Sequence, residues 1–234
     1  MSLTACEKEI FNRILKEELV PATGCTEPVA IAYAAAAAKK ALGCEPEVCE
    51  AELSGNIIKN ARCVAVPNTG GLKGIEAAVA AGVVAGRAEL ALDVLSAATG
   101  REEEIRDFLE KRGVSVRPAD NDLTFFIRVT VGAGSSRAKA VIEGFHTNLV
   151  LIEKDGIELF RSGAKSNPCC VADRSMLTVE KIVEFADVAD LAEIREILER
   201  QIAFNSAISE EGLKGDWGAN VGKVILKTFG DSPE

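Results

Sequence analysis

The sequence is poor in the features that most often mark nucleic-acid-binding and membrane proteins. Aromatic residues make up 5% of it, and the formal net charge is −9 with no long cluster of lysine or arginine. This acidic balance argues against binding to nucleic acid or to an anionic membrane surface. The most apolar run, residues 29–38, continues into Lys39 and Lys40 and is too short to cross a bilayer. A small molecule is therefore the expected ligand.

Other absences narrow the class further. Seven cysteines, an odd number without a leading signal peptide, do not fit a secreted disulfide framework, so we expect a reducing cytoplasm. No G-x-x-x-x-G-K-S/T string is present, which excludes a Walker-type nucleotide loop. The sequence also shows no internal repeat and no low-complexity linker. A chain of 234 residues can bury a substantial core.

The first hundred residues read as helices joined by short turns. Thr4 and Glu7 have the spacing of a capping box, and the apolar residues that follow predict an amphipathic helix ending before Pro21. An alanine-rich helix comes next and is closed by Gly43. A short strand is expected within residues 48–53, and further helices are expected over residues 75–84, 88–98 and 101–111.

The period of the apolar residues changes after Gly113. Residues 123–131, 138–145 and 149–160 alternate as strands do, and Asp155 with Gly156 marks a hairpin, so these segments are predicted to form one antiparallel sheet. Helices return over residues 179–185 and 191–208, and residues 212–222 introduce one last apolar helix. We therefore predict an α+β fold in which an antiparallel β-sheet interrupts a helical domain. Three parts are expected: residues 1–112, residues 113–160, and residues 161–234 packing back on the first part.

The sequence PATGCTEP, residues 21–28, forms a polar elbow between two apolar segments. Pro28 suits the first turn of a helix, and Thr26 could cap it through its side-chain oxygen. Cys25 would then lie at a helix N-terminus, where the dipole favours a thiolate, so we expect it to be the most reactive thiol. The alternative is a buried, inert thiol on a capping turn.

A second polar stretch precedes the helix expected at residues 75–84. Residues 54–60 combine small, amide and basic side chains, and residues 67–71 form a glycine-rich turn. Backbone N–H groups at such a turn can hold a carboxylate. An ordinary connection between helices explains the pattern equally well.

Four stretches together resemble one known family. They are PATGCTEPVA (residues 21–30), SGNIIKNARCVAVPNTGG (54–71), HTNLVLIEKDG (146–156) and GLKGDWGANVGKVIL (212–226). In this order, along nearly the whole chain, they resemble the N-terminal portion of the L-cysteine desulfidase family, iron-sulfur relatives of the bacterial L-serine dehydratase α chain.

This resemblance implies a lyase of cysteine catabolism that works without pyridoxal phosphate. The implied reaction is the α,β-elimination of L-cysteine to pyruvate, ammonia and sulfide. The implied cofactor is a four-iron, four-sulfur (4Fe-4S) cluster held by three cysteines, with one iron open as a Lewis acid. Cys25 matches the N-terminal ligand, whereas the other two lie in a glycine- and cysteine-rich half that these 234 residues do not show. Four other cysteines are expected to be structural: Cys44, Cys49, Cys169 and Cys170.

Candidate site residues lie within the stretches that carry the resemblance. His146, the single histidine, and Lys59 are the catalytic candidates, and the proposed substrate-binding residues are Ser54, Asn56, Asn60, Thr147 and Asn148. A histidine exchanges protons near neutral pH and suits acid-base work or carboxylate binding. The alternative for His146 is a turn residue hydrogen-bonded to the backbone.

Three functional hypotheses remain open at this point. The first is the N-terminal portion of a cysteine desulfidase that is inactive alone, and the second is a lyase similar to L-serine dehydratase. The third is a non-enzymatic small-molecule-binding or regulatory module that has lost the cluster half. The expected partner is an amino acid, L-cysteine or L-serine, with further copies of the same chain as an open alternative.

Overall fold

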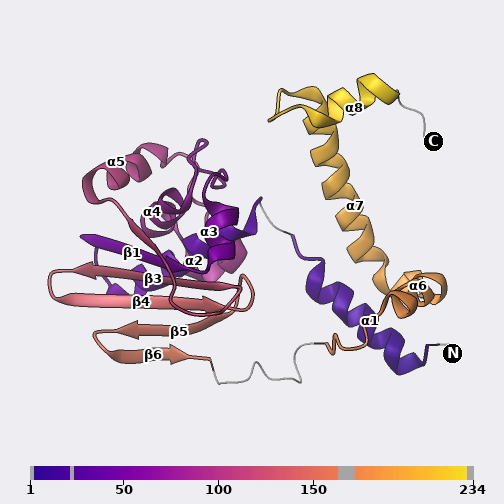
Figure 1. Cartoon of the computed structure of the whole chain (residues 1–234), viewed down its shortest axis with the longest axis horizontal. Coiled ribbons are helices and arrows are strands. Elements are labelled where there is room, and N and C mark those ends of the chain that lie inside the picture. The colour runs from indigo at the N-terminus through magenta and orange to yellow at the C-terminus, as the bar shows by residue number, and fades with distance from the viewer. Residues whose placement is uncertain (1–2, 22–23, 163–171, 231–234) are drawn as a thin grey trace. The chain divides into compact units, whose positions relative to one another are not determined.

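The computed structural model describes residues 3–21, 24–162 and 172–230, and it divides the chain into two compact units (Figure 1). One unit comprises Ala22–Ser166, and the other combines Met1–Pro21 with Asn167–Glu234. This division differs from the three predicted parts 1–112, 113–160 and 161–234. Strand β1 (Val48–Leu53), in the part expected to be helical, pairs with the later strand β3 (Phe126–Ala133), so those two parts share one core.

The strands of residues 24–162 form one six-stranded sheet in the order β2-β1-β3-β4-β5-β6. Strands β3 to β6 are antiparallel to their neighbours, as predicted. The sheet as a whole is mixed, because β2 runs parallel to β1. The fold class is thus α+β. The remaining strands of the sheet are β2 (Ser115–Pro118), β4 (Ser136–Glu143), β5 (Leu149–Lys154) and β6 (Ile157–Arg161).

The predicted hairpin at Asp155 and Gly156 is confirmed. It joins β5 to β6, and Lys154 pairs with Ile157 across the turn. Asp155 has φ 50° and Gly156 has φ 81°, and a two-residue type I′ turn requires positive φ at both positions. The carboxylate of Asp155 also accepts a hydrogen bond from the backbone N–H of Arg137 at 2.7 Å, which fixes the turn against β4.

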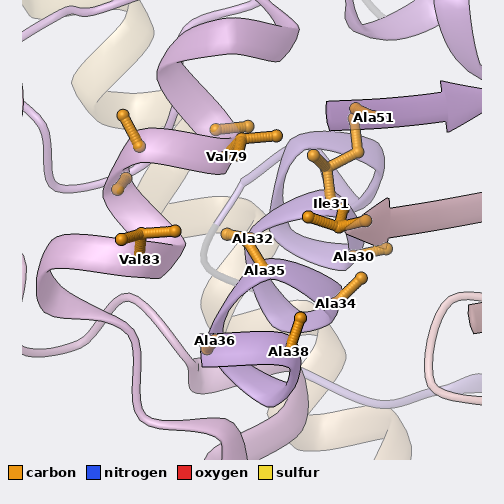
Figure 2. Packing of buried hydrophobic residues seen from close by; sticks show 14 of the residues in the cluster. Ala30, Ile31, Ala32, Ala34, Ala35, Ala36, Ala38, Ala51, Val79 and Val83 are labelled. Carbon is orange, nitrogen blue, oxygen red and sulfur yellow. The ribbon is translucent and has the colours of Figure 1, made fainter. Parts of the chain in front are cut away.

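Helix α2 (Thr26–Leu42) lies at the centre of this unit and packs against strands β3 to β5 and helix α4 (Ile75–Ala85). Figure 2 shows Ala32, Ala35 and Ala36 on the side toward Val79 and Val83 of α4. The small alanine side chains allow the two helices to approach closely. A Cβ atom on Gly82 of α4 would lie 2.2 Å from the carbonyl oxygen of Ala32, so the backbones themselves are in contact there.

Two local predictions in this unit are corrected by the structure. Residues 88–98 do not form the expected helix, because the 3-10 helix η1 (Ala88–Asp93) is kinked at Ala91 with φ 46°. The chain then turns so that Val94 and Leu95 are buried in the core. Residues 54–60 lie largely in a short helix, α3 (Gly55–Ala61), which the sequence pattern did not predict. Helix α5 (Glu102–Arg112) agrees closely with its prediction.

The second unit is built from helices alone within its described residues. Helix α1 (Ala5–Glu18) begins with the predicted capping box between Thr4 and Glu7. Phe11 of α1 stacks on Phe185 at 4.9 Å between ring centroids, and Lys181 pairs with Glu7 at 2.7 Å. The other helices of this unit are α6 (Val179–Val188), α7 (Leu191–Lys214) and α8 (Val221–Phe229).

Across residues 3–21, 24–162 and 172–230, no helix has both the length and the apolar composition needed to cross a membrane.

Candidate active site

The elbow of residues 21–28 leads directly into α2, and its Cys25 occupies the N-cap position of that helix. Residues 22 and 23 lie outside the described residues. Gly24 has φ 142°, a conformation that side chains rarely allow, and a Cβ there would lie 3.2 Å from the ring of Pro67. Glycine at this position therefore lets the elbow pass close to the loop that follows α3.

Glu27, in the first turn of α2, connects Cys25 to Asn60 of α3. The Cys25 thiol donates a hydrogen bond to Glu27 Oε2 at 3.0 Å, and the Asn60 amide donates to Glu27 Oε1 at 3.2 Å. Both carboxylate oxygens are thus engaged, each by a different element. An acidic side chain in the first turn is also favoured by the helix dipole.

His146 reaches the same helix end from the loop between β4 and β5. Its Nε2 lies 2.9 Å from the hydroxyl oxygen of Thr26, and its ring makes an edge contact with Phe125 at 4.7 Å between centroids. The loop is held by Asn148, whose side-chain amide donates to the Glu143 carbonyl at 2.8 Å. We call Cys25, Thr26, Glu27, Asn60 and His146 the elbow cluster.

The charge states of the elbow cluster follow from burial and from these hydrogen bonds. Burial raises the pKa of the Cys25 thiol, and its hydrogen bond to Glu27 raises it further. The pKa of Glu27 is lowered, first by the hydrogen bond from Cys25 and also by Asn60 and the nearby imidazole. Burial lowers the pKa of His146, and the charge of Glu27 opposes that shift. At neutral pH the cluster therefore holds a protonated thiol, a carboxylate and a neutral imidazole.

These states give the cluster two proton-exchanging groups of different character. Neutral His146 can accept a proton near neutral pH. The Cys25 proton already points at a carboxylate, so Glu27 can receive it when the sulfur binds an electrophile.

Two expectations about the elbow are corrected. The Thr26 hydroxyl does not cap α2: Cys25 is the N-cap residue and forms no side-chain capping bond, while Thr26 Oγ1 contacts His146. The pKa of Cys25 is not lowered by its position at the helix N-terminus. Partial burial and an adjacent carboxylate outweigh the dipole.

The other predicted site residues lie around this region in different roles. Ser54 is buried, and its hydroxyl donates to the Thr124 carbonyl and accepts from the N–H of Phe126, so it joins the ends of β1 and β3. Asn56 and Lys59 are exposed on α3, and Thr147 is exposed beside His146. The structure thus brings together Cys25, Asn60 and His146 from three distant parts of the sequence.

Glu27 and Thr26 are the cluster residues that sequence reasoning did not assign to the site. The available signal was the placement of Glu27 two residues after Cys25, in the first turn of the expected helix. The contact of Thr26 with His146 spans 120 residues and leaves no local pattern.

The residues described here do not by themselves fit a four-iron, four-sulfur cluster. Within residues 3–21, 24–162 and 172–230 no group of three histidine, cysteine, aspartate or glutamate side chains could hold a metal ion. Cys49, predicted to be structural, is buried with a pKa raised to about 12 by desolvation. Cys44, also predicted to be structural, is an exposed free thiol. Cys169 and Cys170 lie outside the described residues.

Comparison with known proteins places the chain among relatives that share a name. It is 45% identical over 225 residues to a UPF0597 protein of Desulfitobacterium hafniense, covering 95% of this chain and 52% of the relative. A UPF0597 protein of Lachnoclostridium phytofermentans is 42% identical, covering 93% of this chain and 52% of the relative. One from Treponema denticola is 40% identical, with coverage of 97% and 53%. The names of these relatives state no activity, substrate or partner.

The chain spans about half the length of the curated relatives it matches. No protein-family model matches the sequence. No solved structure matches it either.

Proposed function

We propose that this chain is the N-terminal, amino-acid-binding portion of an iron-sulfur cysteine desulfidase, a carbon-sulfur lyase of the reducing cytoplasm. The observation that carries the proposal is the elbow cluster. Cys25, Asn60 and His146 were each predicted as site residues from the sequence, and they meet at the N-terminus of α2. A shared function would account for the meeting of these three predicted site residues at one helix end.

The proposed reaction has two stages, an elimination and a hydrolysis. The α-proton of L-cysteine is removed, the Cβ–S bond breaks, and the sulfur leaves with the bonding electron pair as hydrosulfide. The aminoacrylate that remains takes up a proton and then water, which gives pyruvate and ammonia. L-Cysteine and water are thereby converted into pyruvate, ammonia and hydrogen sulfide.

The residues of this chain supply acid-base and binding groups for these changes. His146 is neutral and can take the α-proton through a ring nitrogen, while the Thr26 hydroxyl fixes the position of its ring. The exposed ammonium of Lys59 and the amides of Asn56 and Asn60 lie on α3, where they can attract the substrate carboxylate. Ser54 has no such role, because its hydroxyl already donates to the Thr124 carbonyl and accepts from the N–H of Phe126.

Departure of hydrosulfide requires an electrophile, and the residues described here do not hold one. Cys25 offers one thiol, which by itself cannot hold a cluster. In this proposal the remaining groups come from the half of the relatives that this chain does not match. A binding module without turnover is the second candidate, favoured by the presence of binding groups without a full ligand set.

The test combines this chain with the unmatched half of the D. hafniense relative under anaerobic conditions, after reconstitution with iron and sulfide. Sulfide and pyruvate release are measured with L-cysteine and with L-serine. Release of both products from L-cysteine supports a desulfidase, whereas pyruvate release from L-serine alone supports the dehydratase alternative. Binding of L-cysteine without either product supports the binding module.

Two matched variants show whether the elbow carries the activity. Cys25→Ser is expected to lower turnover by about 100-fold or more, because a hydroxyl is a poor ligand and a poor nucleophile. Cys44→Ser makes the same chemical change at an exposed cysteine of the same unit and should leave turnover unchanged. Equal activity of the two variants contradicts the assignment of the site to the elbow.

A further inference from the structure

Helix α8 carries an apolar stripe that the described residues leave exposed. None of its residues is buried, and Phe229 and Val221 are 77% and 61% exposed. The apolar residues recur at spacings of three and four, which places them on one face, whereas Lys223 and Lys227 lie on the opposite face. The stripe consists of Val221, Val224, Ile225 and Phe229, with Leu226 beside it.

The second half of α7 also exposes apolar residues. Ile194 is its buried residue, near the start, where Glu193 contacts Asn12 of α1. Farther along, Ile202 and Ile208 are 63% and 70% exposed. Trp217, in the turn between α7 and α8, is 61% exposed, and its indole N–H donates to the Glu211 carbonyl. We call α8 with the second half of α7 the C-terminal hairpin; Figure 1 shows the two helices in succession.

The apolar face of α8 must pack against a partner for the helix to be stable. An isolated helix of nine residues is too short to persist in water, and it requires packing of its apolar face. Exposed apolar side chains that include a tryptophan and a phenylalanine are characteristic of an interface core. The C-terminal hairpin therefore has the composition of a docking surface.

We infer that the C-terminal hairpin binds the polypeptide that makes up the other half of the UPF0597 relatives, through apolar helical segments of that half. The relatives match 92 to 98% of this chain and are about twice as long. Each relative therefore carries, in the same polypeptide, about as many residues outside the matched segment as within it. Because this unmatched half is covalently connected to the matched segment, its effective concentration at the surface exceeds that of a second, unconnected copy of the chain.

The first test is co-expression of this chain with the unmatched half of the D. hafniense relative, followed by light scattering after size exclusion. A one-to-one complex is expected. The double variant Ile225→Ser with Phe229→Ser should weaken the complex by roughly 100-fold, since two anchors are removed. The control Lys223→Ser with Lys227→Ser changes the opposite face at the same four-residue spacing and should retain the complex.

The second test uses hydrogen exchange and does not depend on separately produced halves. In the full-length D. hafniense protein, the segment that aligns with α8 should exchange about tenfold or more slowly than α8 of this chain alone. Equally fast exchange in both proteins overturns the inference. So does slow exchange of α8 in this chain by itself, or a homodimer that the Ile225→Ser, Phe229→Ser variant disrupts, because the surface is then already covered. Neither test measures turnover, so failure here leaves the proposed reaction untouched, and failure of the reaction leaves this interface untouched.

Discussion

Two opposing effects act on the thiol of Cys25. Its place at the N-terminus of α2 favours the thiolate, by an amount typically about 0.3–1 kcal/mol, which is less than one pKa unit. Burial and the hydrogen bond to the Glu27 carboxylate favour the thiol and prevail, so its pKa is raised. The Cys25 thiol is therefore protonated beforehand and loses its proton only when its sulfur binds an electrophile.

The first prediction concerns the rate of alkylation at Cys25. Because its pKa is raised, Cys25 should react with iodoacetamide more slowly at mildly alkaline pH than the exposed Cys63. Glu27→Gln removes the carboxylate and should accelerate labelling of Cys25 but not of Cys63. Glu45→Gln, beside the exposed Cys44, is the control and should change neither rate. Mass spectrometry of digested samples gives the rates, and Cys25 reacting fastest in the unmodified chain would contradict the prediction.

The second prediction concerns His146, whose signal is unambiguous because the chain has one histidine. Burial lowers its pKa below 6.5, and the charge of Glu27 opposes the shift. Titration of its C2 proton by NMR should show this depressed value, and Glu27→Gln should depress it further. A titration midpoint above 6.5 in the unmodified chain is the result that would refute this.

The same shift makes stability depend on pH. The folded state binds the His146 proton less tightly than the unfolded state does. The contribution of His146 to the free energy of unfolding is therefore complete above the pKa that it has in the unfolded state. It is lost as the pH falls through the pKa that it has in the folded state. The free energy of unfolding should decline on acidification below about pH 6.5. The variant His146→Gln should show a smaller decline in urea titrations.

At the scale of elements, the close contact between α2 and α4 leaves no room for a side chain at one position of α4. Gly82 lies where a Cβ would meet the Ala32 carbonyl at 2.2 Å, and the two helices must separate to accept any side chain. Helix propensity favours alanine over glycine by about 1 kcal/mol, but overpacking in a closed core costs about 1–3 kcal/mol. The steric effect should therefore prevail.

The third prediction follows directly. Gly82→Ala should lower the free energy of unfolding by up to about 2 kcal/mol, the difference between these two effects. Gly55→Ala, in α3, adds the same methyl group where nothing lies within 4 Å of the new Cβ, and it should be neutral or slightly stabilising. Urea denaturation of both variants gives the comparison. Equal stabilities would mean that α2 and α4 do not approach as closely as described.

At the scale of the whole molecule, the site and the reaction have different requirements. The residues of the elbow cluster all belong to Ala22–Ser166, so the proposed recognition of an amino acid draws on this unit. Breaking the Cβ–S bond requires an acceptor for the sulfur, and the described residues do not provide a metal-binding group. Binding and turnover should therefore be separable.

The fourth prediction is that this chain alone binds L-cysteine weakly and releases neither sulfide nor pyruvate. Weak binding is expected because carboxylate and amine recognition needs no metal. The His146 resonance should shift on addition of L-cysteine but not of propionate, which serves as the control without an amino group or a thiol. Anaerobic assays after iron and sulfide reconstitution measure turnover. Steady turnover by the chain alone would require cluster ligands among cysteines other than Cys25.

The sequence by itself determined the local structure where short-range chemistry decides it. The capping box at Thr4, the closure of α2 by Gly43 and the hairpin at Asp155 and Gly156 all depend on residues within a few positions of one another. Alternation of apolar residues likewise predicted the antiparallel strands β3 to β6. The resemblance of short motifs pointed to Cys25 and His146, and side-chain chemistry pointed to Asn60.

The tertiary structure alone decided the features that depend on distant neighbours. The charge state of Cys25 depends on burial and on Glu27, and the position of His146 depends on a contact with Thr26 across 120 residues. The bend at Ala91 arises as Val94 and Leu95 enter a core built by other elements. Local patterns record propensity, whereas these outcomes depend on which surfaces meet, because burial and proximity change both backbone conformation and proton affinity.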